Sequence, residues 1–277
     1  MKTFLVPVDF SETSKNAALY AANFAATIPG AQIILYNVYG KVYLPGADDA
    51  ANSRRNVAIN ELESLKKSIE SLKTGVAGAA IPDITYVAEE GSFVSNLEQL
   101  VKVNKFDMIV MGITGSSRLT QIFMGTNTLH VIRHVDIPVM IIPPDAKYTG
   151  IKRVLFTSDF KNVKRTTPFD ELTDILNLFN PALHIVNVDS EHYIELTDEY
   201  KKERGVLETK LNAFTPEFSF LRSFDFLDGI NLFIETNKID AVITVPKKHN
   251  FLAQLFQTSH TKKLAYHSHV PTFAIPC

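Results

Sequence analysis

The segment MGITGSSRLTQIFMGTNT, residues 111–128, combines glycines and hydroxyl side chains at a spacing that suits phosphate binding. The glycines at 112, 115 and 125 form the pattern G-x2-G-x9-G-T. Glycine lets the backbone approach a ligand closely and permits positive φ. The last glycine precedes an expected helix, whose first N–H groups and partial positive charge suit an anion. The segment therefore predicts a phosphate loop, with further donors from Ser116, Ser117, Arg118, Thr126 and Thr128.

Two better-known phosphate fingerprints are absent from the chain. No G-x-x-x-x-G-K-[ST] occurs, and no G-x-G-x-x-G follows the first expected strand. Single glycines are also common in ordinary turns. The alternative is therefore that the three glycines only make turns.

Alternating strand and helix patterns must position this segment. Short apolar runs predict strands, and capped or amphipathic runs predict helices. Ser11 is the expected N-cap of the first helix, and the charged helix is expected to face solvent. Apolar strands alternating with helices predict a doubly wound parallel sheet, which binds ligands beyond the carboxyl ends of its strands. The expected strands are 3–9, 32–39, 84–89, 107–113 and 138–143, and the expected helices 11–28, 52–74, 95–105 and 126–135.

An internal repeat indicates two homologous domains. A shift of 150 residues places Asp9 on Asp159 and Asn37 on Asn187. A shift of 133 then aligns KFDMIVM with KIDAVIT, LTQIF with LAQLF, and DIPVMIIP with HVPTFAIP. We expect domains at 1–145 and 150–277, joined by the turn-rich PPDAKYTG near residues 145–150.

Composition excludes several classes of protein. The 277 residues carry a formal charge of −2, from 28 basic and 30 acidic side chains, so nucleic acid is not an expected partner. No apolar run approaches a membrane span, and the opening MKTFLVPVDF is too short for a signal peptide. A single cysteine, Cys277, forms no internal disulfide, which suits the cytoplasm.

Four segments of the chain together resemble the universal stress protein family. They are the glycine pattern, VPVDFSETS near the start, NV after the second strand, and RHVDIPVMIIP. The family's nucleotide-binding members carry G-x2-G-x9-G-[ST] at this place. The resemblance covers the first domain and, more weakly, the second, and a tandem member is the close match. It implies two five-stranded sheets of adenine-nucleotide alpha-hydrolase-like fold, with strand order 3-2-1-4-5. It also implies that the last strand of each half pairs with its counterpart, as an internal pseudo-dimer.

The resemblance assigns a role to each matching position. Asp9 would lie near ribose and adenine, beside Pro7 and Val8, and Val38 would meet adenine through its backbone. Phe10 stands where many members have glycine, and its ring would narrow the adenine side. The residues that would flank the nucleotide or wrap its phosphates are Met111, Gly112, Gly115, Ser117, Arg118, Gly125, Thr126, Asn127 and Thr128.

The second domain lacks the glycines. The 133 shift places Val245 on Gly112, Lys248 on Gly115, and Thr258–Ser259 on Gly125–Thr126. Side chains there would occupy the space that phosphate needs, so we expect no ATP binding in this domain. The basic cluster at 247–249 is expected to be a solvated turn, with a site for another anion as the alternative.

No catalytic or metal-binding residue is predicted. His130 and His134 are four apart on one expected helix, a metal-ligand spacing for which the sequence offers no third ligand, so contact with backbone carbonyls is expected. His267 and His269 form only a weak candidate zinc site. Cys277 has no His–Asp pattern near it, so a catalytic thiol is not expected. The nucleophile-elbow motif G-x-S-x-G is absent, so no catalytic serine is expected.

The expected function is that of a nucleotide-responsive stress regulator. The first domain would bind ATP with Mg²⁺, since such ions bridge phosphates, and alter contact with an unidentified protein partner. No general base or water-orienting residue is apparent, so at most weak ATP hydrolysis is expected. The competing classes are a nucleotide-independent scaffold and a slow ATPase.

Overall fold

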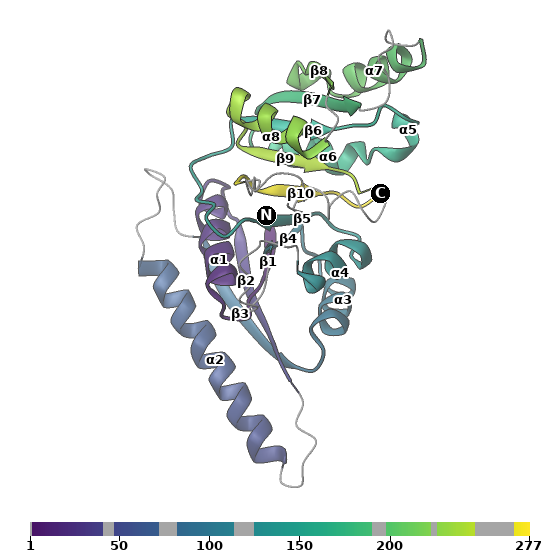
Figure 1. The fold of residues 1–277 in the computed structure, drawn as a ribbon. Helices are drawn as coiled ribbons and strands as arrows, with labels where there is room; N and C mark the ends of the chain where they lie inside the picture. The colour runs from purple at the N-terminus through teal and green to yellow at the C-terminus, as the bar shows by residue number, and fades with distance from the viewer. Residues whose placement is uncertain are drawn as a thin grey trace. The chain divides into compact units, whose positions relative to one another are not determined.

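The computed structural model describes residues 2–40, 47–71, 82–113, 125–189, 198–222, 226–246 and 269–277 (Figure 1). The chain divides into two compact units, with the boundary between Thr149 and Gly150. Each unit is a parallel five-stranded sheet with helices. How the two units associate stays a prediction.

The first unit has the expected strand order, β3-β2-β1-β4-β5. The register pairs Leu5 with Ile34 and with Ile109, so β1 is central. Helices α1 and α2 cover one face of this sheet, and α3 and α4 cover the other (Figure 1). Its elements are β1 (Thr3–Pro7), α1 (Glu12–Ala25), β2 (Gln32–Tyr39), α2 (Ala47–Ser71), β3 (Asp83–Glu90), α3 (Phe93–Val103), β4 (Met108–Gly112), α4 (Thr126–His134) and β5 (Val139–Ile142).

The second unit repeats this topology, with strand order β8-β7-β6-β9-β10. Its first crossover consists of two short helices, α5 and α6, where the first unit has the single helix α1. Its elements are β6 (Arg153–Thr157), α5 (Val163–Thr166), α6 (Phe169–Asn177), β7 (Ala182–Asp189), α7 (Asp198–Lys210), a 3-10 turn (Asn212–Phe214), β8 (Glu217–Arg222), α8 (Phe226–Asn237), β9 (Ala241–Thr244) and β10 (Thr272–Ala274).

The core of the first unit lies on both faces of its central strands. Every residue of β4 is buried, which is typical of a parallel strand covered on both sides. Helix α1 buries Ala17, Ala18 and Ala21, whose small side chains let it approach the sheet closely. Phe24 from the same helix packs on Phe4, with ring centroids 5.0 Å apart. Burial of these apolar groups is the main term that stabilises the unit.

Helix α2 is the expected charged cover and begins at Ala47, earlier than the predicted 52–74; residues 72–74 lie outside the described part of the chain. It buries Ala58, Leu62 and Ile69 in a narrow stripe. Lys67 and Glu63 form a 2.7 Å ion pair on the exposed face. No helix in the described part of the chain combines the length and apolar character needed to cross a bilayer.

The expected N-cap of α1 is confirmed. Ser11 has extended backbone angles, and its side chain accepts a hydrogen bond from the Ser14 N–H at 3.2 Å. Asp9 lies two residues before this N-cap. Its carboxylate accepts the Ser11 N–H at 3.1 Å, which closes the turn between β1 and α1.

That turn has the same unusual backbone in both units. Phe10 and its repeat counterpart Phe160 have φ of 63° and 51°. Side chains rarely adopt this left-handed region, whereas glycine does so without strain. The two phenylalanines differ in environment, because Phe160 is buried against Phe220 in the second unit whereas Phe10 is half-buried.

A buried hydroxyl ties β2, β3 and α3 together. The Tyr36 hydroxyl donates to the Glu89 carboxylate at 2.6 Å, and the Asn96 amide donates to the same oxygen at 3.3 Å. Burial raises the pKa of Tyr36 above its usual range, and the bond to Glu89 and the charge of Glu89 raise it further.

The raised pKa of Tyr36 should make the stability of the first unit depend on pH in the alkaline range. The raised pKa keeps Tyr36 protonated in the folded state after unfolded chains ionise, so its contribution to stability is present below about pH 10 and is lost above it. We expect the free energy of unfolding above this pH to fall less steeply in Tyr36→Phe than in the wild type. Denaturation of both proteins across the alkaline range, with tyrosinate absorbance recorded, measures this difference. Equal slopes of the unfolding free energy against pH in the two proteins would contradict the prediction.

Candidate functional site

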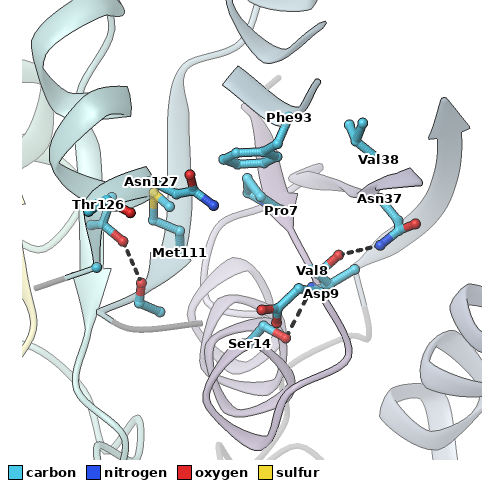
Figure 2. A pocket seen from close by; sticks show the side chains of 13 residues that line it. Pro7, Val8, Asp9, Ser14, Asn37, Val38, Phe93, Met111, Thr126 and Asn127 are labelled. Carbon is cyan, nitrogen blue, oxygen red and sulfur yellow. Dashed lines mark hydrogen bonds between the residues drawn. The ribbon is translucent and has the colours of Figure 1, made fainter. Parts of the chain in front are cut away.

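A cavity of about 380 Å³ lies at the carboxyl ends of β1, β2 and β4, against the first residues of α3 and α4 (Figure 2). It sits where the strand order reverses, between β1 and β4, which is where open α/β sheets bind ligands. Its volume falls in the range of small-molecule sites. The described residues that line it are Pro7, Val8, Asp9, Ser14, Asn37, Val38, Phe93, Met111, Gly112, Gly125, Thr126, Asn127 and Thr128.

The structure brings most of the sequence-predicted residues to this one cavity. Gly115, Ser117 and Arg118 lie outside the described residues. Ser14, Asn37 and Phe93 also line the cavity and were not among the predicted residues. Of these, Phe93 carries a sequence signal, since it is an aromatic residue directly after GS at the end of the third strand. The predicted residues found at the cavity are Pro7, Val8, Asp9, Val38, Met111, Gly112, Gly125, Thr126, Asn127 and Thr128.

Gly112 is required by packing between a strand and a helix. A Cβ atom on it would lie 2.9 Å from the Thr13 Cγ2 and 3.1 Å from the Thr13 carbonyl oxygen. Its φ is not positive. The glycine therefore lets the first turn of α1 lie directly against the end of β4, which in turn places Ser14 in the cavity wall.

Gly125 is the N-cap of α4 and has the ordinary extended angles φ −60° and ψ 147°. Its N–H donates to the Ile113 carbonyl at 2.7 Å. The first N–H groups of a helix have no acceptor within the helix, and an Asp, Asn or Ser cap would satisfy one of them with its side chain. Glycine cannot, so the amides at the start of α4 are left for another acceptor.

The hydroxyl of Thr128 has a structural role, unlike the expected contact with phosphate. The side chain is buried, and its Oγ1 lies 3.2 Å from the Gly112 carbonyl oxygen and 3.3 Å from that of Ile113. The hydroxyl proton is thereby directed to the backbone. Among the described residues that line the cavity, Thr126 and Asn127 have the exposed polar side chains at this end.

Both ends of the cavity combine polar and apolar groups, with Asn37 and Val38 toward one end and Met111, Thr126 and Asn127 toward the other (Figure 2). In Figure 2, Val38 lies at one end, Thr126 and Asn127 lie at the other, and the Asp9 carboxylate lies between them. Phe93 and Pro7 add apolar surface to the middle of the cavity. Phe10 is not among the described lining residues, so the structure does not show its ring narrowing the cavity.

Asn37 holds the end of β1 in place. Its buried side-chain amide donates to the Val8 carbonyl at 2.8 Å, and the Val8 N–H bonds to the Tyr36 carbonyl at the same distance. The second unit repeats the contact, with the Asn187 amide donating to the Ser158 carbonyl at 2.9 Å. The repeated asparagine is therefore a structural clamp in both units.

These clamps allow a matched pair of substitutions. Asn37→Ala and Asn187→Ala each remove one buried hydrogen bond, and each should lower the free energy of unfolding of its unit by about 1 kcal/mol. Only Asn37→Ala should also weaken the binding of a ligand in the first unit's cavity, because Asn37 fixes Val8 and Val8 lines that cavity. Chemical denaturation measures the loss of stability, and calorimetric titration measures the loss of ligand affinity. If Asn187→Ala also lowers the affinity, the effect of Asn37→Ala does not come from its contact with Val8.

The second unit differs at the positions that the repeat makes equivalent. Val245 replaces Gly112 and is buried, while Thr244 replaces Met111. Asp159 is exposed and its carboxylate accepts the Lys161 N–H at 3.1 Å. The residues aligned with Gly115, Gly125 and Thr126 lie outside the described residues, as do the basic cluster 247–249 and His267. His269 and Cys277 are exposed.

The fold and cavity define a duplicated, doubly wound α/β protein with a ligand-sized cavity at the switch point of its first sheet. Residues 1–143 match the model of the universal stress protein family. The chain belongs to this family, in a tandem form with two units of the same topology.

Similar proteins agree with this assignment. Universal stress protein MJ0577 of Methanocaldococcus jannaschii is 26% identical over 164 residues, which cover 51% of this chain and 94% of that protein. A universal stress protein from Archaeoglobus fulgidus has a TM-score of 0.70 at 19% identity, over 99% of this chain and 98% of its own. A putative universal stress protein from Pseudomonas aeruginosa has a TM-score of 0.61 at 11% identity, over 100% of this chain and 93% of its own. These two structures share the fold along the whole chain.

Proposed function

We propose that the first unit binds ATP in the cavity between β1 and β4, and that the protein is a nucleotide-responsive stress regulator. The observation that carries this proposal is the start of α4. A helix of nine residues begins at the cavity with glycine as its N-cap, so its first amides and its partial positive charge face a space of about 380 Å³.

The arrangement of the lining fits the three parts of an adenine nucleotide. Val38 and Phe93 offer apolar and aromatic surface to a base. The exposed Asp9 carboxylate suits ribose hydroxyls, which can donate to it, and repels phosphate. Phosphates would then lie beside Gly125 and accept from the N–H groups of Thr126 and Asn127, which have no acceptor within the helix. Gly115, Ser117 and Arg118 would complete the phosphate loop, and Mg²⁺ would accompany the phosphates.

The second unit would not bind ATP in this way, because a buried valine replaces Gly112 there. The bound nucleotide would alter contact with a protein partner, as expected of a regulator in the cytoplasm. Hydrolysis would be weak at most.

Calorimetric titration of the full chain with ATP–Mg²⁺ tests the proposal. We expect one site per chain, with affinity lost when Gly125 carries an acidic side chain. Absence of heat and of any thermal shift would favour the nucleotide-independent scaffold. Phosphate release that scales with protein and disappears in Gly115→Val would favour the slow ATPase.

A further inference from the structure

A cluster of three metal-ligating side chains lies outside the nucleotide cavity. Glu98 extends from α3, and His130 and His134 extend from α4. One ligand atom from each lies within 4.8 Å of the others. The sequence shows only the pair of histidines four residues apart, and the packing of α3 against α4 supplies the carboxylate as a third group.

One of the two histidines, His134, already has a hydrogen bond of the kind that holds metal-binding histidines in place. The His134 Nδ1 lies 2.8 Å from the His130 carbonyl oxygen. A carbonyl only accepts, so Nδ1 carries the proton and the lone pair is on Nε2. A ring nitrogen bonded to a backbone carbonyl is the usual outer-shell arrangement for a metal-binding histidine. The two rings stack with centroids 3.9 Å apart and planes 16° from parallel. Because an imidazole nitrogen binds a metal within its ring plane, the rings must tilt apart for both nitrogens to reach one ion.

The spacing to the carboxylate also suits a shared ion. His130 Nε2 and Glu98 Oε1 are 3.7 Å apart, longer than a hydrogen bond. Two ligands at the bond lengths that zinc takes are about 3.4 Å apart in a tetrahedron. A small side-chain rotation therefore brings both atoms onto one ion. The three side chains are half-buried or exposed, so an ion reaches them from solvent.

We propose that Glu98, His130 and His134 bind a divalent transition metal of the zinc type. Two imidazole nitrogens and one carboxylate oxygen are a recurrent zinc ligand set, and water would take the fourth position. The ion would link α3 to α4. These are the helices whose first residues, Phe93 and Gly125–Thr128, line the nucleotide cavity.

Zinc titration of the full chain, stripped with a chelator, tests the site. We expect wild-type protein to bind one Zn²⁺ per chain and to gain thermal stability as it does so. Glu98→Gln and His134→Ala should each weaken this binding at least about tenfold. His184→Ala is the matched control. His184 Nδ1 is 3.4 Å from Glu217 Oε2 but belongs to no three-ligand cluster among the described residues, so its loss should leave the site intact.

The chain has eight histidines, so uptake alone is not sufficient evidence. Co²⁺ in place of Zn²⁺ reports the coordinating nitrogens through its visible absorption. Loss of that absorption in both cluster variants, with retention in the control, supports the proposal. Equal zinc affinity and equal thermal shift in all four proteins would overturn it and leave His134 with only its contact to the helix backbone. Glu98→Gln conserves shape on the surface, so it keeps the test valid if His134→Ala folds poorly.

Discussion

Gly125→Asp should weaken ATP binding about 100-fold while leaving the fold intact. An aspartate at the N-cap would accept hydrogen bonds from the N–H groups of Asn127 or Thr128 and would add a negative charge beside the phosphates. A charged hydrogen bond contributes about 1.5–3 kcal/mol and a 100-fold loss of affinity is about 2.8 kcal/mol, so loss of one such bond together with the added repulsion accounts for this factor. The measurement is calorimetric titration with ATP–Mg²⁺.

The same substitution should not destabilise the protein. Aspartate is a slightly better N-cap than glycine, by a few tenths of a kcal/mol, and φ of −60° is open to any residue. Thermal unfolding without nucleotide should therefore be unchanged or slightly higher in temperature. Loss of affinity with retained stability distinguishes a blocked phosphate site from a damaged fold.

Gly125→Ala is the matched control. Alanine adopts the same backbone angles but cannot accept from the helix amides, so most of the affinity should remain. If the alanine variant loses as much affinity as the aspartate variant, the amides of α4 are not what holds the phosphates. If neither loses affinity, ATP does not bind at this helix.

The second large effect is expected at Gly112, where alanine should destabilise the first unit by about 2 kcal/mol or more. The new Cβ would lie 3.1 Å from the Thr13 carbonyl oxygen and 3.2 Å from its carbon, and these backbone atoms belong to the first turn of α1. Overpacking of this kind typically costs about 1–3 kcal/mol. Because the same turn carries Ser14, the cavity should change as well, and ATP affinity should fall.

Gly205→Ala provides a control of opposite sign. Gly205 lies inside α7, and no heavy atom lies within 4 Å of an added Cβ. Alanine is favoured over glycine in a helix by about 0.5–1 kcal/mol, so this variant should be more stable. Urea denaturation compares the two. If Gly112→Ala is neutral or stabilising, α1 can move away from the added Cβ without loss of stability. Close packing against Thr13 would then not be the reason for this glycine.

The motif glycines show how far reasoning from the sequence reached. Their location at the carboxyl end of β4 followed from the alternation of apolar strands and helices. The reasons for them did not, because neither Gly112 nor Gly125 has a positive φ. Gly112 avoids Thr13, which is distant in sequence, and Gly125 leaves helix amides without a side-chain cap. Such contacts depend on which helix lies against which strand.

The residues that were missed have the same explanation. Ser14 and Phe93 line the cavity because α1 and α3 begin there, and Asn37 lines it because β2 ends there. Thr128 looked like a phosphate ligand from its hydroxyl alone, but packing buries that hydroxyl against two carbonyls. Each of these outcomes depends on neighbours from another element.

The sequence by itself determined the duplicated parallel-sheet fold, the strand order through its family resemblance, and the N-cap at Ser11. These follow from the periodicity of apolar residues, from hydrogen bonds between residues close in sequence, and from the repeat of segments in the same order. All three can be recognised in the amino-acid sequence. Only the tertiary structure decided what Gly112 is for, that Phe93 faces the cavity, and that Glu98 joins His130 and His134. The physical reason is that these roles arise between side chains brought together by packing, and packing joins residues whose separation in sequence carries no signal.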